Sequence, residues 1–451
     1  MTISSARFEL SFVPEDVLKT METIRRTGFD VWIVGGALRD FFLGIDPKDW
    51  DLATGADSGK IVSIFPRVIP VGIRHGTVQV HTRTRNIEVT SFDPAGSAGL
   101  LKDLGRRDFT INSLALSYPE GILIDAHGGR QDLKAGLIRA VGNPAERFSE
   151  DPLRIVRAAR ICAVYGFRID PATFEAMREG SAKLDNMSGE RIRDEMLKIL
   201  PAANFSRAFD LLRKSGALRR LLPGLDAGGN IETCRGPGVS IFEHTRACIL
   251  NCPKRTRVRL AALFHNMGTE MTGPGRRDPA REETGGEAQV TDFRSHSARS
   301  AVDTMKKWNM SNRIIDEVST LVSRQLPQGA SSWSDVSIRR FITTVGPELL
   351  DDFIALAEAE VLSGPHTEAE VEAIRKLRAR LKTQLARTSA LSVRELAISG
   401  DEVMKILNLR PGPEVGKVLR RLFDLVLEDP GLNTREQLAR IVETKYGAAN
   451  P

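Results

Sequence analysis

The sequence has few cysteines and few aromatic residues. Only 4 of its 451 residues are cysteine, which is too few for a disulfide framework and is typical of proteins in a reducing compartment. Aromatic residues make up 6% of the chain, with 3 tyrosines and 4 tryptophans, so few rings are available for a base-stacking platform. Any contact with nucleic acid is therefore expected to be mainly electrostatic.

Long hydrophobic runs are absent as well. No stretch approaches the roughly 18 consecutive apolar residues of a membrane-spanning helix, and the first residues lack the basic region and apolar core of a secretion signal. We therefore expect a soluble cytoplasmic protein with no membrane partner. A formal net charge of +6 permits a polyanionic partner but does not require one. Hydrophobic residues (41%) and charged residues (27%) stand in the proportions of a folded globular chain.

The first third of the chain carries strand patterns. The apolar run Val31–Val34 predicts a buried strand that leads into Gly35-Gly36. Residues Ala37–Gly44 have helical spacing, and Trp50–Thr54 returns to a strand pattern. Two alternating runs, GTVQVHT and NIEVTSF, are joined by a short polar stretch and predict a hairpin.

After Phe148 the pattern changes to long amphipathic helices, the first of which spans Asp151–Tyr165, and no further strand is expected. We therefore predict the α+β class, in which a small mixed α/β head is followed by an all-helical neck, body and tail, since 451 residues exceed what one hydrophobic core supports. The predicted limits are residues 1–147 for the head, 148–215 for the neck, 216–325 for the body and 326–451 for the tail.

Asp49 and Asp51 stand two residues apart at the start of a predicted strand, so both carboxylates project from one face of the sheet. Two negative charges at this distance favour a cation between them, and paired carboxylates suit Mg²⁺. Two such ions can activate an attacking hydroxyl and stabilise a leaving pyrophosphate. This is the chemistry of nucleotidyl transfer. Alone, the D-x-D pattern is common, and a solvated turn is the alternative reading.

The glycine turn that precedes Asp49 and Asp51 favours nucleotidyl transfer over a solvated turn. Gly35 and Gly36 lie between a strand and a helix, where free backbone N–H groups and the helix dipole favour phosphate. Arg39, one turn into that helix, can add a guanidinium group for a triphosphate. After the strand, the glycine turn, the helix and the D-x-D pattern follow one another within the 17 residues from Gly35 to Asp51.

This segment, GGALRDFFLG…KDWDLAT, resembles the signature of the class II nucleotidyltransferases, which are the bacterial-type tRNA CCA-adding enzymes and the bacterial poly(A) polymerases. Four further motifs follow in the order of that family, namely RRDFTINSLAL, IDAHGGRQDLKAGLIRAVG, EDPLRIVRAARICAVYGF and SGERIRDEMLKIL. The resemblance implies a polymerase-β-like head, tRNA, CTP and ATP as partners, and Mg²⁺ as the cofactor. It leaves the oligomeric state open.

The resemblance also implies roles for individual residues. Asp49 and Asp51 would hold the metal ions and be catalytic, and Glu88 would be a third carboxylate, although an ordinary strand glutamate explains it equally well. Nucleotide binding is implied for a larger set, which comprises Gly35, Gly36, Arg39, Arg107, Asp108, Asp151, Arg154, Arg157 and Arg160. Within this set, Asp151 and Arg154 lie three residues apart on a predicted helix and would read the edge of the base. This protein pair would then select CTP or ATP without a nucleic-acid template.

The chain departs from the family pattern at two places. His244, His265 and His296 follow the layout of an HD-type metal site, but Asn266 stands where an aspartate is expected, so we predict a structural remnant. Only 10 residues separate Phe92 from Asp103, and the resemblance links a short segment here to enzymes that add CC only. The product therefore stays open between CC and CCA. A poly(A) polymerase and an inactive RNA-binding relative are the alternatives.

Overall fold

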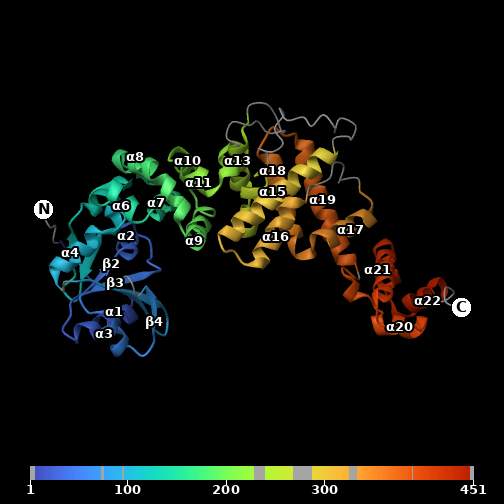
Figure 1. Ribbon diagram of the computed structural model, residues 1–451, viewed down its shortest axis with the longest axis horizontal. Helices are drawn as coiled ribbons and strands as arrows, with labels where there is room; N and C mark the ends of the chain where they lie inside the picture. Colours follow the sequence, from blue (N-terminus) through green and yellow to red (C-terminus); the bar gives the residue numbers. More distant parts are fainter. Residues whose placement is uncertain are drawn as a thin grey trace. The chain divides into compact units, whose positions relative to one another are not determined.

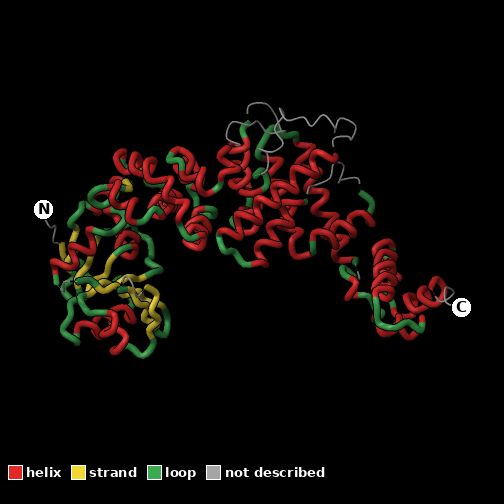
Figure 2. Tube along the Cα trace, viewed as in Figure 1, coloured by secondary structure: helices red, strands yellow, loops and turns green. Residues whose placement is uncertain are grey.

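The computed structural model describes residues 6–72, 76–93, 96–227, 239–267, 287–324, 333–388 and 390–446. The chain divides into two compact units, Met1–Leu221 and Leu222–Pro451. The described strands all lie in the first unit, and the elements of the second are helices (Figures 1 and 2). The predicted α+β class, with a mixed sheet followed by helices, is therefore confirmed. The predicted limits of head, neck, body and tail stay predictions.

One sheet organises the first unit. Within the described residues it has eight strands in the order β1-β8-β7-β2-β3-β6-β5-β4. The strands are β1 (Ala6–Arg7), β2 (Val31–Val34), β3 (Trp50–Thr54), β4 (Val68–Gly72), β5 (Thr77–His81), β6 (Asn86–Ser91), β7 (Leu114–Ser117) and β8 (Ile122–Asp125). Strands β3 and β6 are parallel, and the other neighbours are antiparallel. Strand β3, which carries Asp51, thus lies inside the sheet.

The burial of these strands follows their sequence patterns. All four residues of β2 are buried, as expected for a continuous apolar run covered on both faces. Strands β5 and β6 alternate between buried and less buried positions along most of their length and pair antiparallel, so the predicted hairpin is confirmed. The turn between them is closed by a 2.9 Å hydrogen bond from the Thr82 N–H to the Arg85 carbonyl.

Helices lie around this sheet (Figure 1). They are α1 (Glu15–Arg25), α2 (Gly36–Phe42), α3 (Ser58–Ile64), α4 (Ser97–Gly105) and α5 (Gly129–Ala135). Helix α2 follows β2 after a single residue, Gly35, as the strand–turn–helix pattern predicts. This connection brings the start of α2 next to the start of β3, because β2 and β3 are antiparallel and Val34 pairs with Asp51.

The rest of the first unit is formed by α6 (Pro144–Glu150), α7 (Leu153–Tyr165), α8 (Pro171–Gly180), α9 (Gly189–Ile199), α10 (Phe205–Lys214) and α11 (Ala217–Leu221). The prediction of one helix from Asp151 to Tyr165 is wrong at its start, since Asp151 lies between α6 and α7. Pro152 has no N–H to continue α6, and Asp151 before it is extended, with φ −146° and ψ 96°. The expectation of no strand after Phe148 is also wrong, because Arg168–Ile169 forms β10, paired with β9 (Leu137–Ile138).

The second unit is built from helices α12 (Pro223–Ala227), α13 (Ile241–Asn251), α14 (Thr256–Phe264), α15 (Glu287–Lys307), α16 (Asn312–Ser323), α17 (Asp335–Val345), α18 (Leu350–Leu362), α19 (Glu368–Arg387), α20 (Gly400–Leu407), α21 (Pro413–Glu428) and α22 (Arg435–Tyr446). Helix α18 is buried along most of its length and contacts α13, α14 and α19. Helices α20, α21 and α22 share a separate hydrophobic cluster around Leu422 and Leu438.

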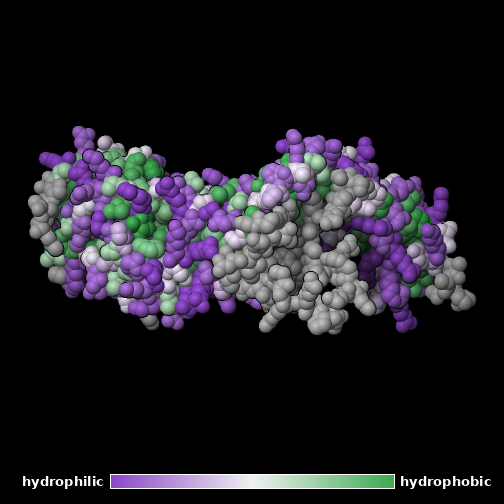
Figure 3. Space-filling model, turned by 90° about the horizontal axis from the view of Figure 1, so that it is seen from above, coloured by the Kyte–Doolittle hydropathy of each residue, from purple (hydrophilic) through white to green (hydrophobic). Residues whose placement is uncertain are grey.

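Hydrophilic side chains cover most of the described surface in the view of Figure 3, and hydrophobic ones form small groups between them. Among the described residues, no helix has the length and apolar character needed to cross a lipid bilayer. The cytoplasmic location expected from the sequence stays a prediction.

Candidate active site

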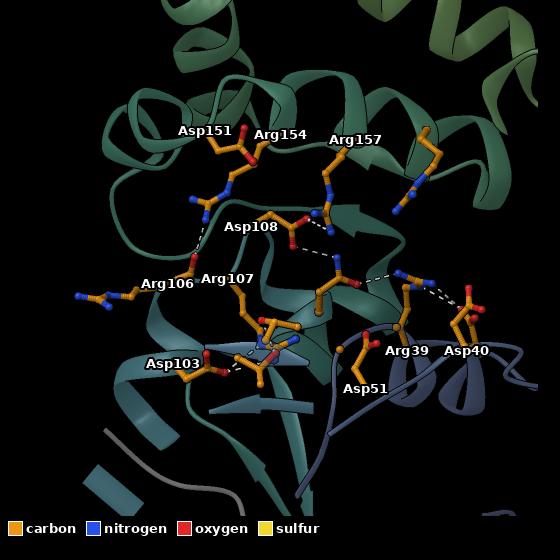
Figure 4. A pocket seen from close by; sticks show the side chains of 17 residues that line it. Arg39, Asp40, Asp51, Asp103, Arg106, Arg107, Asp108, Asp151, Arg154 and Arg157 are labelled. Carbon is orange, nitrogen blue, oxygen red and sulfur yellow. Dashed lines mark hydrogen bonds and ion pairs between the residues drawn. The ribbon is translucent and has the colours of Figure 1, made fainter. Parts of the chain in front are cut away.

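A cavity of about 510 Å³ lies within the first unit, beside the glycine turn and helix α7 (Figure 4). Its volume is that of an ordinary small-molecule site. Its lining is highly charged, with six arginines and six aspartates. The charged residues are Arg39, Arg106, Arg107, Arg154, Arg157, Arg160, Asp40, Asp49, Asp51, Asp103, Asp108 and Asp151. Gly35, Gly36, Thr77, Thr90 and Asn112 complete the lining.

Eleven of the twelve residues that the sequence singled out line this cavity, and Glu88 is the exception. The eleven come from the glycine turn, α2, β3 and the residue before it, the segment that follows α4, and the region of α7. The sheet and the helices after residue 143 thus place motifs more than 100 residues apart in the chain around one space.

Both glycines of the turn occupy positions that a side chain would obstruct. Gly35 has a φ of 76°, and a Cβ atom there would lie 2.9 Å from Nη1 of Arg107 and 3.1 Å from Oδ2 of Asp51. A Cβ atom on Gly36 would lie 3.3 Å from Nη2 of Arg39. The turn therefore lets two guanidinium groups and a carboxylate approach the backbone closely.

Asp51 lies on β3 and Asp49 is the residue before this strand, on either side of the buried Trp50, and both line the cavity. Their projection from one face of the sheet stays a prediction. Burial raises the pKa of Asp51, the Arg107 guanidinium opposes this rise, and the negative charge of Asp49 adds to it. The ionised pair is therefore unfavourable by itself. A divalent cation between the carboxylates would reverse that balance, so these two residues fit a metal site.

Glu88 is the neighbour of Asp51 on the parallel strand β6. Partial burial raises its pKa, and the Asp51 carboxylate raises it further. Within the described ranges, no group of three or more His, Cys, Asp or Glu side chains is arranged to hold a metal ion. The structure therefore brings Glu88 near Asp51 but not into a cluster of three ligands, and its catalytic role stays a prediction.

Asp108 is the centre of a buried polar group. It accepts hydrogen bonds from the Phe109 N–H at 2.8 Å and from Nδ2 of Asn112 at 3.0 Å, and it forms a 2.8 Å ion pair with Arg157 of α7. Burial alone would raise the pKa of Asp108, but Arg157 and the two hydrogen bonds outweigh it and hold that pKa below its ordinary value. In turn, the charge of Asp108 raises the pKa of Arg157. Asp108 thus fixes Arg157 at the cavity.

Asp151 and Arg154 both line the cavity, although they are not on one helix as predicted. The Asp151 carboxylate accepts a 2.8 Å hydrogen bond from Arg191 of α9. Arg154 donates to Glu150 at 3.1 Å. It also donates to the Arg106 carbonyl at 2.6 Å (Figure 4). Protein partners therefore hold both side chains that the resemblance assigns to base selection.

Arg160 is held from the neighbouring helix α9, where Glu195 pairs with it at 3.2 Å, and burial lowers the pKa of Arg160. Several lining residues escaped the sequence analysis. Asp103, on α4, stands four residues before Arg107 and pairs with it at 3.2 Å, and this spacing of opposite charges was a local signal for the pair. Asn112 and Asp40 carry no such local signal.

In the second unit, the rings of His244 and His265 lie 5.3 Å apart between centroids. Nδ2 of Asn266 lies 2.8 Å from Nε2 of His265. His296 lies on α15. The amide at position 266 thus contacts a histidine of the HD-like layout, and the predicted remnant stays a prediction.

Comparison with known families gives three matches. Residues 31–139 match the poly A polymerase head domain, residues 166–228 match an RNA- and SrmB-binding site of polymerase A, and residues 282–442 match tRNA nucleotidyltransferase domain 2. The matches run in the same order as the head and the helical parts of this chain.

Comparison with individual proteins gives matches over nearly the whole chain. A CCA-adding enzyme of Lactococcus lactis is 30% identical over 97% of this chain and 98% of its own length. A CCA-adding enzyme of Geobacillus stearothermophilus is 28% identical over 94% of this chain and 95% of its own length. Among solved structures, the Bacillus stearothermophilus CCA-adding enzyme in complex with CTP has a TM-score of 0.68 at 26% identity, covering 96% of this chain and 97% of its own. A Thermotoga maritima CCA-adding enzyme complexed with tRNA shares the fold, with a TM-score of 0.55 at 18% identity over 97% of both chains.

Proposed function

The chain belongs to the family of CCA-adding enzymes, and from this premise we propose how its cavity acts on the 3′ end of tRNA. The family membership rests on 30% identity to a CCA-adding enzyme over 97% of the chain. The activity is template-independent nucleotidyl transfer from CTP and ATP, with release of pyrophosphate. The observation that carries the assignment is the meeting of Asp49, Asp51 and the glycine turn with the arginines of α7 in one cavity.

The triphosphate side of the cavity is provided by arginines that other residues hold in place. Asp103 orients Arg107, Asp108 orients Arg157, and Asn112 accepts a 2.8 Å hydrogen bond from Arg39. Guanidinium groups fixed in this way bind phosphate oxygens without a further loss of side-chain freedom. Gly35 and Gly36 leave room for the phosphates near the backbone.

Asp49 and Asp51 would hold the divalent metal that this family generally uses, and we propose Mg²⁺. Their paired oxygens and the raised pKa of Asp51 support a cation there. When bound, Mg²⁺ would stabilise charge on the attacking and leaving oxygens. In the reaction, the tRNA 3′ hydroxyl forms a bond to the α-phosphorus as the bond to pyrophosphate breaks. The arginines hold the β- and γ-phosphates as the leaving group takes up negative charge.

Base selection is proposed for Asp151 and Arg154. A carboxylate and a guanidinium present complementary acceptors and donors to the Watson–Crick edge of a base. Both side chains are held by Arg191, Glu150 and the Arg106 carbonyl. A bound base would therefore replace some of these hydrogen bonds or add new ones to them.

The identity of the relatives favours a complete CCA product. A second product, CC, is favoured by the short connection between β6 and α4, which joins Ser91 to Ser97. The resemblance links a longer segment at this place to the switch from C to A addition.

The test is to incubate the purified protein with tRNA that lacks its whole CCA end, together with CTP, ATP or both. Products are then sized at single-nucleotide resolution. Three added nucleotides with both triphosphates identify a CCA-adding enzyme, and two identify a CC-adding enzyme. A long adenylate ladder or no incorporation would contradict the proposed function.

A further inference from the structure

Arg39 is held from several directions. Its Nε and Nη2 atoms lie 3.0 and 2.9 Å from Oδ1 of Asp40, and its Nη1 atom donates to Asn112 at 2.8 Å. Its side chain is 10% exposed, and the guanidinium lies over Gly36. These contacts fix a guanidinium group that belongs to the lining of the cavity.

Tyr165 reaches this group from the last turn of α7, 125 residues further along the chain. Its hydroxyl donates a 2.6 Å hydrogen bond to the same Oδ1 atom of Asp40. Its ring lies under the guanidinium, with Cζ of Arg39 4.8 Å from the ring centroid. Tyr165 therefore contacts both members of the Arg39–Asp40 pair, one through its hydroxyl and the other through its ring. It is not among the residues that line the cavity.

We propose that Tyr165 is a positioning residue that orients Arg39 for the triphosphate and thereby sets the affinity for CTP and ATP alike. The inference rests on the proposed function, because it needs Arg39 to bind the triphosphate. It adds a residue outside the cavity to the machinery of the site. It also makes α7 a support for both ends of the nucleotide, since the same helix carries Arg154, for which base selection is proposed.

The chemistry of the hydroxyl supports this role. Burial, partly opposed by the Arg39 guanidinium, raises the pKa of Tyr165 to about 12, so the phenol stays protonated and keeps donating over the whole working range of pH. Asp40 thus accepts from Arg39 and Tyr165 at the same oxygen, and the direction of the guanidinium is fixed. Without the hydroxyl, Asp40 loses a donor at Oδ1, and only Asp40 and Asn112 hold the direction of the Arg39 guanidinium through hydrogen bonds.

The test compares Tyr165→Phe, which keeps the ring, with Tyr165→Leu, which removes both contacts. Tyr118→Phe is the matched control, because the Tyr118 hydroxyl also bonds a carboxylate of this unit, that of Glu22 at 3.3 Å, and Tyr118 does not line the cavity. The measurements, made with Mg²⁺ present, are kcat and KM for CTP and for ATP on tRNA ends that accept each, and the inhibition constant of tripolyphosphate, which has no base.

We expect Tyr165→Phe to raise both KM values and the tripolyphosphate constant by the same factor, roughly 3- to 10-fold, which corresponds to the loss of one ordinary hydrogen bond, because Arg39 keeps its bonds to Asp40 and Asn112. Tyr165→Leu is expected to raise them further. In both Tyr165 variants, kcat and the ratio of the KM for CTP to the KM for ATP should stay within about twofold of the wild type. In Tyr118→Phe, kcat, both KM values and the inhibition constant should all stay within about twofold.

Unchanged KM and inhibition constants in both Tyr165 variants would overturn the inference. A lower kcat at unchanged KM would also overturn it, because that result is a loss of correctly folded enzyme. Failure of the wild-type protein to extend tRNA would instead refute the proposed function, so the two failures are distinguishable.

Discussion

Replacement of Asp108 by asparagine tests how the cavity holds its arginines. The Asp108 side chain is 5% exposed, and it carries the charge that pairs with Arg157 at 2.8 Å. Asparagine keeps the size, and its carbonyl oxygen can still accept the bonds from Phe109 and Asn112, but the NH₂ group in place of Oδ2 leaves the guanidinium without its counter-charge. Removing one partner of a fully buried pair costs about 3–5 kcal/mol. Because Arg157 is 35% exposed and water screens it, we expect a smaller loss in the free energy of unfolding, about 2–3 kcal/mol.

Thermal unfolding measures this loss. For a unit of the size of Met1–Leu221, each kcal/mol corresponds to about 2–4 °C, so Asp108→Asn should lower the unfolding temperature by about 4–12 °C. The control is Asp185→Asn. Asp185 pairs with Arg220 at 3.1 Å with side chains 51% and 38% exposed, and its loss should cost less than about 1 kcal/mol.

The difference in stability between the wild type and Asp108→Asn should shrink as the pH falls. The pKa of Asp108 is lowered in the folded protein, so its contribution is complete at neutral pH and is lost as the pH falls below its ordinary value of 3.8. The stabilities of the wild type and Asp108→Asn should therefore converge in acid. Equal unfolding temperatures for the wild type and Asp108→Asn at pH 7, or a difference that grows in acid, would refute the reasoning.

Three further predictions concern the metal and the glycine turn. Asp49→Ala should abolish nucleotide incorporation, because one of the two carboxylates proposed to hold the metal is lost, while the dissociation constant for tRNA in a filter-binding assay should stay within about twofold. Chelation of divalent ions with EDTA should stop incorporation in the single-nucleotide assay, and added MgCl₂ should restore it. Gly35→Ala should lower the free energy of unfolding by about 1–3 kcal/mol, because its φ of 76° with ψ of −136° is a conformation that residues with a Cβ atom rarely adopt. It should also raise the KM for CTP, since the new methyl group displaces Arg107 or Asp51.

The parts of the site that the sequence predicted are those whose neighbours are close in the chain. Gly35, Gly36 and Asp51 meet because β2, the turn and β3 follow one another and the strands pair antiparallel. Strand periodicity and the glycine pair are enough to predict that arrangement. Pro152 also indicates a break between α6 and α7, because proline cannot continue a helix. Helical spacing resumes directly after Pro152, so the boundary is hard to place from the sequence.

The parts that could not be predicted depend on how helices pack. Asp40 and Tyr165 are 125 residues apart, and Asp151 and Arg191 are 40 residues apart. No periodicity or motif indicates that these side chains meet, because their contact depends on how α7 and α9 lie against the elements that carry their partners. The resemblance pointed to eleven of the residues that line the cavity, whereas the bonds that support them depend on the tertiary structure.

The charges of the lining explain why the nucleotide and the metal belong together. Six arginines and six aspartates cancel formally, so the cavity by itself has no excess of positive charge for a triphosphate with roughly four negative charges. A nucleotide together with two divalent cations is close to neutral and matches this lining. Burial and Asp49 make the ionised form of Asp51 unfavourable, and a cation removes that penalty while the arginines bind the phosphates. On the proposed function, the balanced lining would favour the metal-bound nucleotide over the free one, and the base reading proposed for Asp151 and Arg154 would act on nucleotides that meet this first requirement.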